Sequence, residues 1–126
     1  IGYAETDGRF FALTPRVLKL GYAYLASTPL TAVLQNALER LSEAIGESSS
    51  ASILDGGEIV YVARAATRRI MSVGLAVGAR LPAYCTSMGR VLLAALPEAE
   101  ARALVGASHR RALTARTVTG VDEVMA

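Results

Sequence analysis

The spacing of hydrophobic positions changes several times along the chain, and each change predicts an element. Apolar residues at helical spacing predict an amphipathic helix over residues 30–45, and Gly46 is placed to stop it. Before that helix, residues 3–5 and 10–13 predict two short strands around a turn at Asp7 and Gly8. A helix over residues 15–25 follows, with Thr14 as its expected N-cap.

The second half of the chain alternates between strand and helix signals. Residues 50–54 and 58–66 are rich in β-type residues and flank Asp-Gly-Gly, which predicts an antiparallel hairpin. We expect the remaining elements to be a strand at 71–77, a loop at 80–83, a helix capped by Thr86 or Ser87 and running to 95, a helix at 98–105 closed by Gly106, a polar loop at 107–119, and a last helical turn at 121–126 with nothing to pack on.

Strands and helices are grouped along the chain and do not alternate strictly, so the predicted fold class is α+β with an antiparallel sheet. The chain has 126 residues, of which 52% are hydrophobic, enough for one domain with a packed core. The first residue is not Met and the chain stops in an expected helix, so we expect it to be part of a longer polypeptide.

Charge and cysteine content limit the kinds of partner and the cellular compartment that we expect for the protein. A net charge of +2 excludes a uniformly basic coat for nucleic acid, although a local basic patch stays open. The single cysteine, Cys85, allows no intramolecular disulfide, which is typical of a reducing cytoplasm. The sequence has no apolar run of 18 residues and no signal pattern, so we expect a cytoplasmic location and no membrane contact.

A long stretch of the chain lacks acidic residues. Between Glu58 and Glu98 there is no carboxylate, yet the stretch contains five arginines: Arg64, Arg68, Arg69, Arg80 and Arg90. The guanidinium fork suits carboxylates and phosphates, so at least one arginine is expected to meet an anionic ligand. For any single arginine, solvation or pairing with a distant acid remains an open alternative.

Residues 78–90 combine a proline-stiffened loop with a helix start carrying the hydroxyls of Thr86 and Ser87. Unpaired amides at a helix start favour anions. Ordinary N-capping by one hydroxyl explains the same residues, and the pattern leaves both interpretations open.

The sequence contains few residues that could act as catalytic groups. Cys85 and His109 are the only cysteine and histidine, so a nucleophile and base pair is the single enzyme hypothesis, and we expect no enzyme. The sequence offers no metal-ligand spacing, no Walker A loop and no G-x-G-x-x-G, so we expect no cofactor and no metal.

Arg9 lies near the tip of the predicted N-terminal hairpin, where it would suit a contact with DNA backbone. Arg16 and Lys19 add only a thin basic patch, offset by Glu5 and Asp7. A solvated hairpin is the alternative.

Three motifs in order give the chain a family resemblance. Residues 13–21 (LTPRVLKLG) resemble the junction between wing and linker helix in bacterial transcriptional regulators of the IclR family. Residues 55–64 (DGGEIVYVAR) are similar to that family's first effector-domain hairpin. Residues 78–97, with LP, TSMGR and LLAALP, resemble its most recognisable motif. The amino-acid sequence of these motifs is most similar to the subgroup that controls aromatic-acid catabolism, the protocatechuate, hydroxybenzoate and β-ketoadipate regulators.

The resemblance implies a domain plan. Residues 1–14 would be the end of a winged helix-turn-helix, 15–28 a linker helix, and 29–126 the N-terminal part of a GAF/PAS-like effector-binding domain with a curved antiparallel sheet. Most of the helix-turn-helix and the C-terminal half of the effector domain would lie outside this sequence.

The resemblance also implies a site and a mechanism. The effector would be a small carboxylic acid, aromatic or of the β-ketoadipate type. Other branches of the family sense glyoxylate, pyruvate or related small acids, and this alternative stays open. The pocket would be lined by Ile70, Val73, Leu81, Thr86, Ser87 and Met88. Binding would switch the affinity for operator DNA in a homodimer or tetramer. A stand-alone small-molecule sensor without DNA binding is the alternative.

Overall fold

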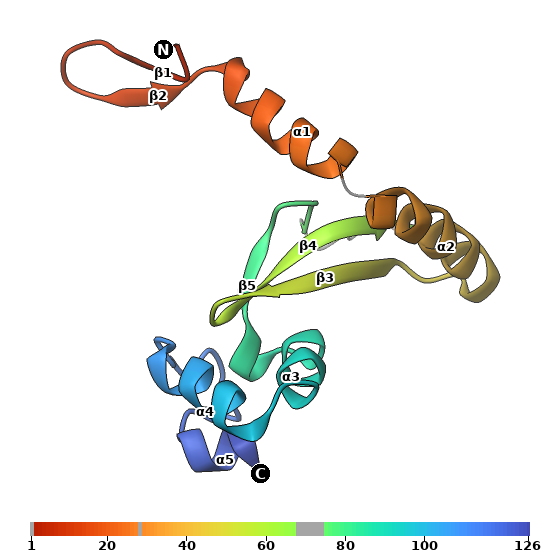
Figure 1. Cartoon of the computed structure of the whole chain (residues 1–126), viewed down its shortest axis with the longest axis vertical. Coiled ribbons are helices and arrows are strands. Elements are labelled where there is room, and N and C mark those ends of the chain that lie inside the picture. Colours follow the sequence, from red (N-terminus) through yellow and green to blue (C-terminus); the bar gives the residue numbers. More distant parts are fainter. Residues whose placement is uncertain (1, 28, 68–74) are drawn as a thin grey trace.

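The computed structural model describes residues 2–27, 29–67 and 75–126. Helices accompany two antiparallel sheets, one with two strands and one with three, which confirms the α+β class (Figure 1). The elements in chain order are β1 (Ala4–Thr6), β2 (Phe11–Leu13), the 3-10 turn η1 (Pro15–Val17), α1 (Leu18–Ser27), α2 (Pro29–Ile45), β3 (Ser49–Asp55), β4 (Glu58–Ala65), β5 (Arg80–Pro82), the 3-10 turn η2 (Ala83–Cys85), α3 (Ser87–Ala94), α4 (Glu98–Ala107) and α5 (Val121–Met125).

The N-terminal hairpin forms as predicted and lies at the far end of the molecule from α4 and α5 (Figure 1). Asp7 Oδ1 accepts hydrogen bonds from the N–H groups of Arg9 and Phe10, and Gly8 takes a positive φ of 90° that the turn requires. Thr14 does not cap the following helix. Its hydroxyl donates to the Gly2 carbonyl and so fastens the chain end to the hairpin instead.

α1 has no buried residue, although its sequence is largely apolar. α2 ends at Ile45 as predicted, because Gly46 adopts a φ of 70° and its N–H bonds to Ser42. Only part of the predicted apolar stripe of α2 is covered: Leu38 is buried, whereas five other members are exposed, namely Leu30, Val33, Ala37, Leu41 and Ile45.

The three-stranded sheet has the order β3-β4-β5, with every neighbour antiparallel. Its register shifts once: Ala51 pairs with Ala63, but Ser52 pairs with Tyr61, so the pairing passes over Val62. Because side chains alternate between faces, this bulge places Tyr61 and Ala63 on opposite faces of the sheet.

Each face of the sheet therefore packs against different helices. Ile59 and Tyr61 join the larger core, together with residues of η2, α3, α4 and α5. Ala63 and Ala65 join a smaller core with Leu38 of α2. The site described below lies on the first of these faces.

The segment before α3 differs from its prediction. Residues 75–77 are not a strand, and the rest of the strand expected at 71–77 lies outside the described residues. A turn brings the chain back onto β4, where Gly78 and Ala79 bond to Tyr61. Residues 80–82, expected as a loop, then form β5. The proline in this strand is tolerated because β5 pairs with β4 alone among the described strands.

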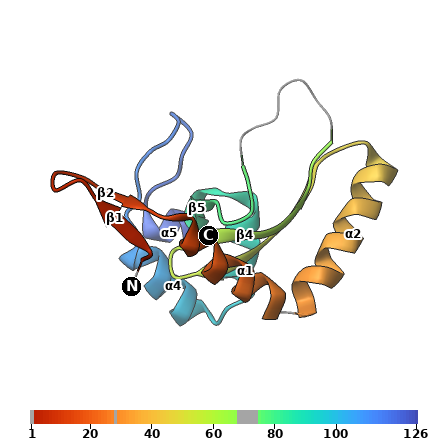
Figure 2. The same cartoon turned by 90° about the horizontal axis from the view of Figure 1, so that it is seen from above.

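The C-terminal part also departs from prediction in two places. α4 does not stop at Gly106 but continues to Ala107, and the guanidinium of Arg110 caps its end by donating to the carbonyls of Val105, Gly106 and Ser108. α5 does have a packing partner, because Val124 is buried in the larger core. The polar segment between α4 and α5 is a projecting loop, as expected (Figure 2).

No single helix in the described ranges is long and apolar enough to cross a membrane. Taken together, Pro15–Ser27 and Pro29–Ile45 pass a test of length and composition, but they form a bent pair.

Candidate effector-binding groove

An open groove lies between β3 and α3. Its volume is about 340 Å³, which is within the range of small-molecule sites. The lining combines three serine hydroxyls with apolar groups, and no acidic residue of the described ranges contributes to it. The lining residues are Ser50, Ala51, Ser52, Ser87, Met88, Val91 and Leu92.

Two of the predicted effector-binding residues meet in this groove. Ser87 is exposed at the first position of α3, and Met88 beside it is half-buried, with Sδ 3.4 Å from Ser52 Oγ. The α3 helix positions both side chains, because Thr86 caps its N-terminus as predicted by accepting a hydrogen bond from the Gly89 N–H.

The other predicted site residues have different surroundings. Thr86 also donates its hydroxyl proton to the Pro82 carbonyl at 2.9 Å, so its single donor is already in use and it could only accept a further hydrogen bond. Leu81 packs against the larger core. It pairs with Ile59 of β4, and the two side chains lie on the same face of the sheet. Ile70 and Val73 lie outside the described residues.

Arg64 supplies positive charge at the edge of the groove. It lies opposite Ser50 in the β3–β4 register, and its Nη1 donates to Ser50 Oγ at 2.9 Å. A guanidinium retains further donors after one such bond. The groove therefore has a cation beside it, hydroxyl groups along it and an apolar floor.

Two other arginines of the acid-free stretch are used elsewhere. Arg80 forms ion pairs of 2.8 Å with both Asp55 and Glu58, on the opposite face of the sheet, and these pairs raise the pKa of its guanidinium. Arg90 donates to the Val124 carbonyl at 3.5 Å, beside α5. Arg68 and Arg69 lie outside the described residues.

The serines of β3 are functional candidates that the sequence reasoning missed. Ser50 and Ser52 line the groove because alternate residues of a strand share a face. The signal was present in the serine-rich run at 48–52, where small polar residues fall on alternate strand positions.

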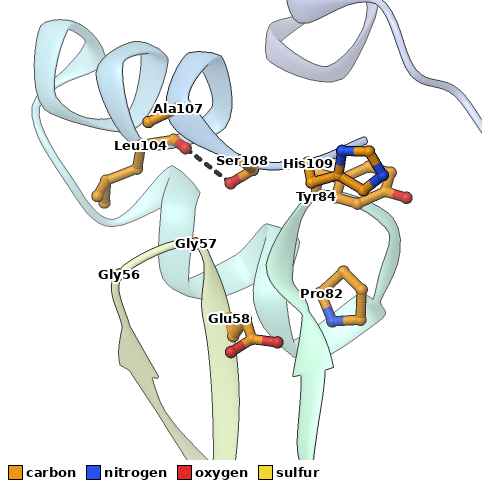
Figure 3. Close-up of a pocket in the computed structure, with 9 residues that line it drawn as sticks. All are labelled: Gly56, Gly57, Glu58, Pro82, Tyr84, Leu104, Ala107, Ser108 and His109. Atoms are coloured by element: carbon orange, nitrogen blue, oxygen red, sulfur yellow. Dashed lines mark hydrogen bonds between the residues drawn. The ribbon is translucent and has the colours of Figure 1, made fainter. Parts of the chain in front are cut away.

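A second cavity, of about 360 Å³, lies between the β3–β4 turn and the end of α4 (Figure 3). Ser108 in its wall donates a hydrogen bond of 2.7 Å to the Leu104 carbonyl. A Cβ at Gly57 would overlap the Ser108 hydroxyl, so a larger residue there would displace this side chain from its bond to Leu104. Leu81, Thr86, Ser87 and Met88, the predicted effector-binding residues that the structure describes, do not line this cavity.

The residues of the enzyme hypothesis lie in and near this second cavity. His109 lines it, whereas the Cys85 sulfur is half-buried in η2 and lies 4.0 Å from the Pro82 carbonyl oxygen. Among the residues that the structure describes, no group of three or more His, Cys, Asp or Glu side chains could hold a metal ion.

Arg9, the predicted DNA-backbone residue, is exposed on the β1–β2 turn. Its guanidinium carbon lies 5.4 Å from the centre of the Phe10 ring. The structure leaves this side chain accessible, and its contact with DNA stays a prediction.

Comparison with known proteins shows the class of the chain. Residues 22–126 match the family model of the bacterial transcriptional regulator IclR C-terminal domain. The chain belongs to the IclR family, as its motifs suggested. It is 47% identical to the Pca regulon regulatory protein of Pseudomonas putida, over 100% of this chain and 44% of that protein.

Solved structures agree with this assignment. A transcriptional regulator of Rhodococcus sp. RHA1 superimposes with a TM-score of 0.81 at 55% identity, over 98% of this chain and 49% of that one. The inducer-binding domain of Acinetobacter PobR, solved with 3-hydroxybenzoic acid, gives a TM-score of 0.67 at 30% identity, over 78% of this chain and 58% of that one.

The comparisons bear on two further expectations. The matched relatives are transcriptional regulators and not enzymes, in agreement with the expectation from the sequence. The subgroup resemblance also holds, since the relatives include regulators of aromatic-acid catabolism. The chain spans less than half the length of the curated Pca regulon protein that it matches.

Proposed function

We propose that this chain carries the effector-binding groove of a transcriptional regulator whose DNA binding is switched by a small carboxylic acid. The observation that carries the proposal is the groove between β3 and α3, which combines a serine-rich wall, an apolar floor and the guanidinium of Arg64 at its edge. The acid is aromatic, like the 3-hydroxybenzoic acid in the PobR inducer-binding domain, or of the β-ketoadipate type that the family resemblance implies.

The chemistry of the groove supports an acidic ring compound. A guanidinium with free donors binds a carboxylate through charge-assisted hydrogen bonds, and serine hydroxyls serve ring hydroxyls or the second carboxylate oxygen. Met88 offers a polarizable thioether for packing against a ring. We propose Ser87 and Met88, which line the groove, as effector-binding residues. Ile70, Val73, Leu81 and Thr86 remain effector-binding residues by the family resemblance.

A thermal-shift screen of the full-length protein tests this function. The panel contains protocatechuate, 4-hydroxybenzoate, β-ketoadipate, glyoxylate and pyruvate. A ligand at about 100 times its Kd adds roughly 2.7 kcal/mol to the free energy of unfolding. A response to an aromatic acid or β-ketoadipate is the expected result. A response to glyoxylate or pyruvate alone would contradict the ligand class, and no response to any compound would reject the proposed site chemistry.

The proposal includes the domain plan and the DNA contact. We assign residues 1–14 to the end of a winged helix-turn-helix, 15–28 to a linker helix and 29–126 to the effector domain. Arg9 would contact the phosphate backbone of operator DNA, since the hairpin carries it exposed and away from the groove (Figure 1). A protein that acts on operator DNA in this way works in the cytoplasm.

We also propose that the protein works as a homodimer or tetramer, with α1 packed against a second copy of the chain. The support is the apolar surface that α1 leaves open: Leu18 and Tyr22 are 71% and 74% exposed. Sedimentation analysis of the full-length Leu18→Glu variant tests this, and the expected result is weaker self-association than in the wild type. An unchanged mass distribution would reject α1 as the interface.

A further inference from the structure

One face of α2 packs against the last residues of β4 and forms hydrogen bonds with them. Gln35, Leu38 and Ser42 share this face because they are three and four positions apart. The Ser42 hydroxyl donates to the Ala65 carbonyl at 3.3 Å, and the Gln35 amide donates to the Arg64 carbonyl at 3.2 Å. Leu38 packs between these two bonds, in the smaller core.

Arg64 is consequently held from two sides. Its backbone carbonyl is bound by Gln35 of α2, whereas its guanidinium is bound by Ser50, which lines the groove. The two bonds leave β4 in different directions, one toward the helix and one toward the groove. A ligand that displaced Arg64 would therefore change the hydrogen bond between its carbonyl and Gln35 of α2.

We infer that Gln35 is the positioning residue that couples occupancy of the groove to the placement of α2, and through α2 to α1. This inference rests on the proposed function. A carboxylate in the groove that binds the remaining donors of Arg64 repositions its guanidinium relative to Ser50, and the accompanying shift of the strand end alters the bond that Gln35 makes. A ligand changes an equilibrium only through contacts that differ between two states, and this bond is such a contact.

The first test needs no ligand. Ser50→Ala and Gln35→Leu act on the same residue, so their effects on the urea midpoint of the full-length protein are expected to be non-additive. The matched control is Asn36→Leu, which removes a similar amide from an exposed position on the same helix. Its effect is expected to add to that of Ser50→Ala. Additive shifts for both pairs would overturn the inference. Gln35→Ala replaces the leucine variant if that variant does not fold.

The second test follows the signal from groove to helix. Hydrogen exchange of the full-length protein is measured with and without 4-hydroxybenzoate or protocatechuate. In the wild type, ligand is expected to slow exchange in β3 and β4 and to change it in α1. In Gln35→Leu, the response of α1 should fall roughly 2- to 30-fold while ligand affinity stays within about twofold. Asn36→Leu should behave as the wild type does.

The outcomes separate the two proposals. An α1 response in Gln35→Leu as large as in the wild type overturns the coupling role while leaving the ligand site intact. A loss of ligand affinity equal to the loss of response shows a merely structural role and overturns it too. Absence of protection in β3 and β4 with either acid contradicts the proposed function, and the double-variant experiment then still decides the contact between Gln35 and Arg64.

Discussion

The phenol of Tyr84 binds both backbone groups of Arg111, a residue 27 positions later in the chain. Its oxygen accepts a hydrogen bond of 3.0 Å from the Arg111 N–H, and its O–H donates to the Arg111 carbonyl. Tyr84 itself is buried in the larger core. This pair fastens the projecting loop between α4 and α5 to the body of the domain.

Tyr84→Phe is expected to free the loop while the core stays packed. The Tm of the full-length protein should fall by about 2–4 °C, and trypsin should cleave faster after Arg110, Arg111 and Arg116. Tyr3→Phe is the matched control, because Tyr3 directly precedes β1, lies outside α1 and is only half-buried. Equal behaviour of the two variants would show that the Tyr84 hydroxyl does not hold the loop.

The same tyrosine should titrate late. Burial, and to a smaller extent the neighbouring Cys85, raises the pKa of the Tyr84 phenol above its ordinary value. The stability that the neutral phenol contributes is therefore present below pH ~10 and is lost as the pH rises through the raised pKa. The ionisation of Tyr84 is measured by absorbance at the phenolate band, as the absorbance of the wild type minus that of Tyr84→Phe. This absorbance difference should rise only at alkaline pH above the usual tyrosine range. A difference that develops at or below that range contradicts the expectation.

Two helical glycines should respond to alanine in opposite directions. A Cβ at Gly89 of α3 would overlap the backbone of Ala83, so Gly89→Ala is expected to cost about 1–3 kcal/mol. At Gly106 of α4 nothing lies within 4 Å of an added Cβ, and Gly106→Ala is expected to be neutral or to add up to about 1 kcal/mol. Urea unfolding measures both. Equal effects would reject the close approach of α3 to η2.

Arginines on the two faces of the sheet should differ in ligand binding. Arg64→Gln removes the cation beside the groove and is expected to lower affinity for an aromatic acid about 10-fold or more. Arg80→Gln is the control, because Arg80 pairs with Asp55 and Glu58 on the opposite face, and it should stay within about twofold of the wild type. Isothermal titration calorimetry measures the affinity of both variants for the aromatic acid. Equal losses, or none, would remove Arg64 from the site.

Met88 should discriminate between classes of acid. Met88→Ala enlarges the groove and removes the sulfur contact to a ring, which is worth about 0.3–1.5 kcal/mol, so affinity for 4-hydroxybenzoate should fall up to about 10-fold. A small acid such as pyruvate makes no ring contact, and its affinity should be nearly unchanged. If both affinities fell alike, Met88 would serve the stability of α3 and not the choice of ligand.

The sequence predicted those elements whose signals are local. The helix stopped by Gly46, the Asp-Gly turn of the first hairpin and the Thr86 cap were all correct, because each depends on neighbouring residues alone. The groove was predicted in part: Ser87 and Met88 meet there, but the contribution of β3 depends on which strand face meets α3, and this is a tertiary relationship.

Errors arose where distant contacts override local preference. Pro82 made residues 80–83 resemble a loop, yet pairing with β4 draws this segment into an edge strand. Gly106 resembled a helix stop, but the helix continues to Ala107, because Arg110 reaches back to the carbonyls of Val105, Gly106 and Ser108 at the helix end. The stripe of α2 resembled a buried face, whereas the sheet offers contact only to the part around Leu38.

The bulge at Val62 has an evolutionary consequence. Because the register passes over this residue, Tyr61 belongs to the face that carries the groove and Ala63 to the face that holds α2. Selection can therefore retune what the groove accepts, through substitutions on one face, without rewriting how the helix docks on the other. Neighbouring residues of a regular strand also point to opposite faces, so deleting Val62 would leave Tyr61 and Ala63 on the faces they occupy now. The bulge is therefore the position at which a lineage can shorten this strand by one residue without exchanging its two faces.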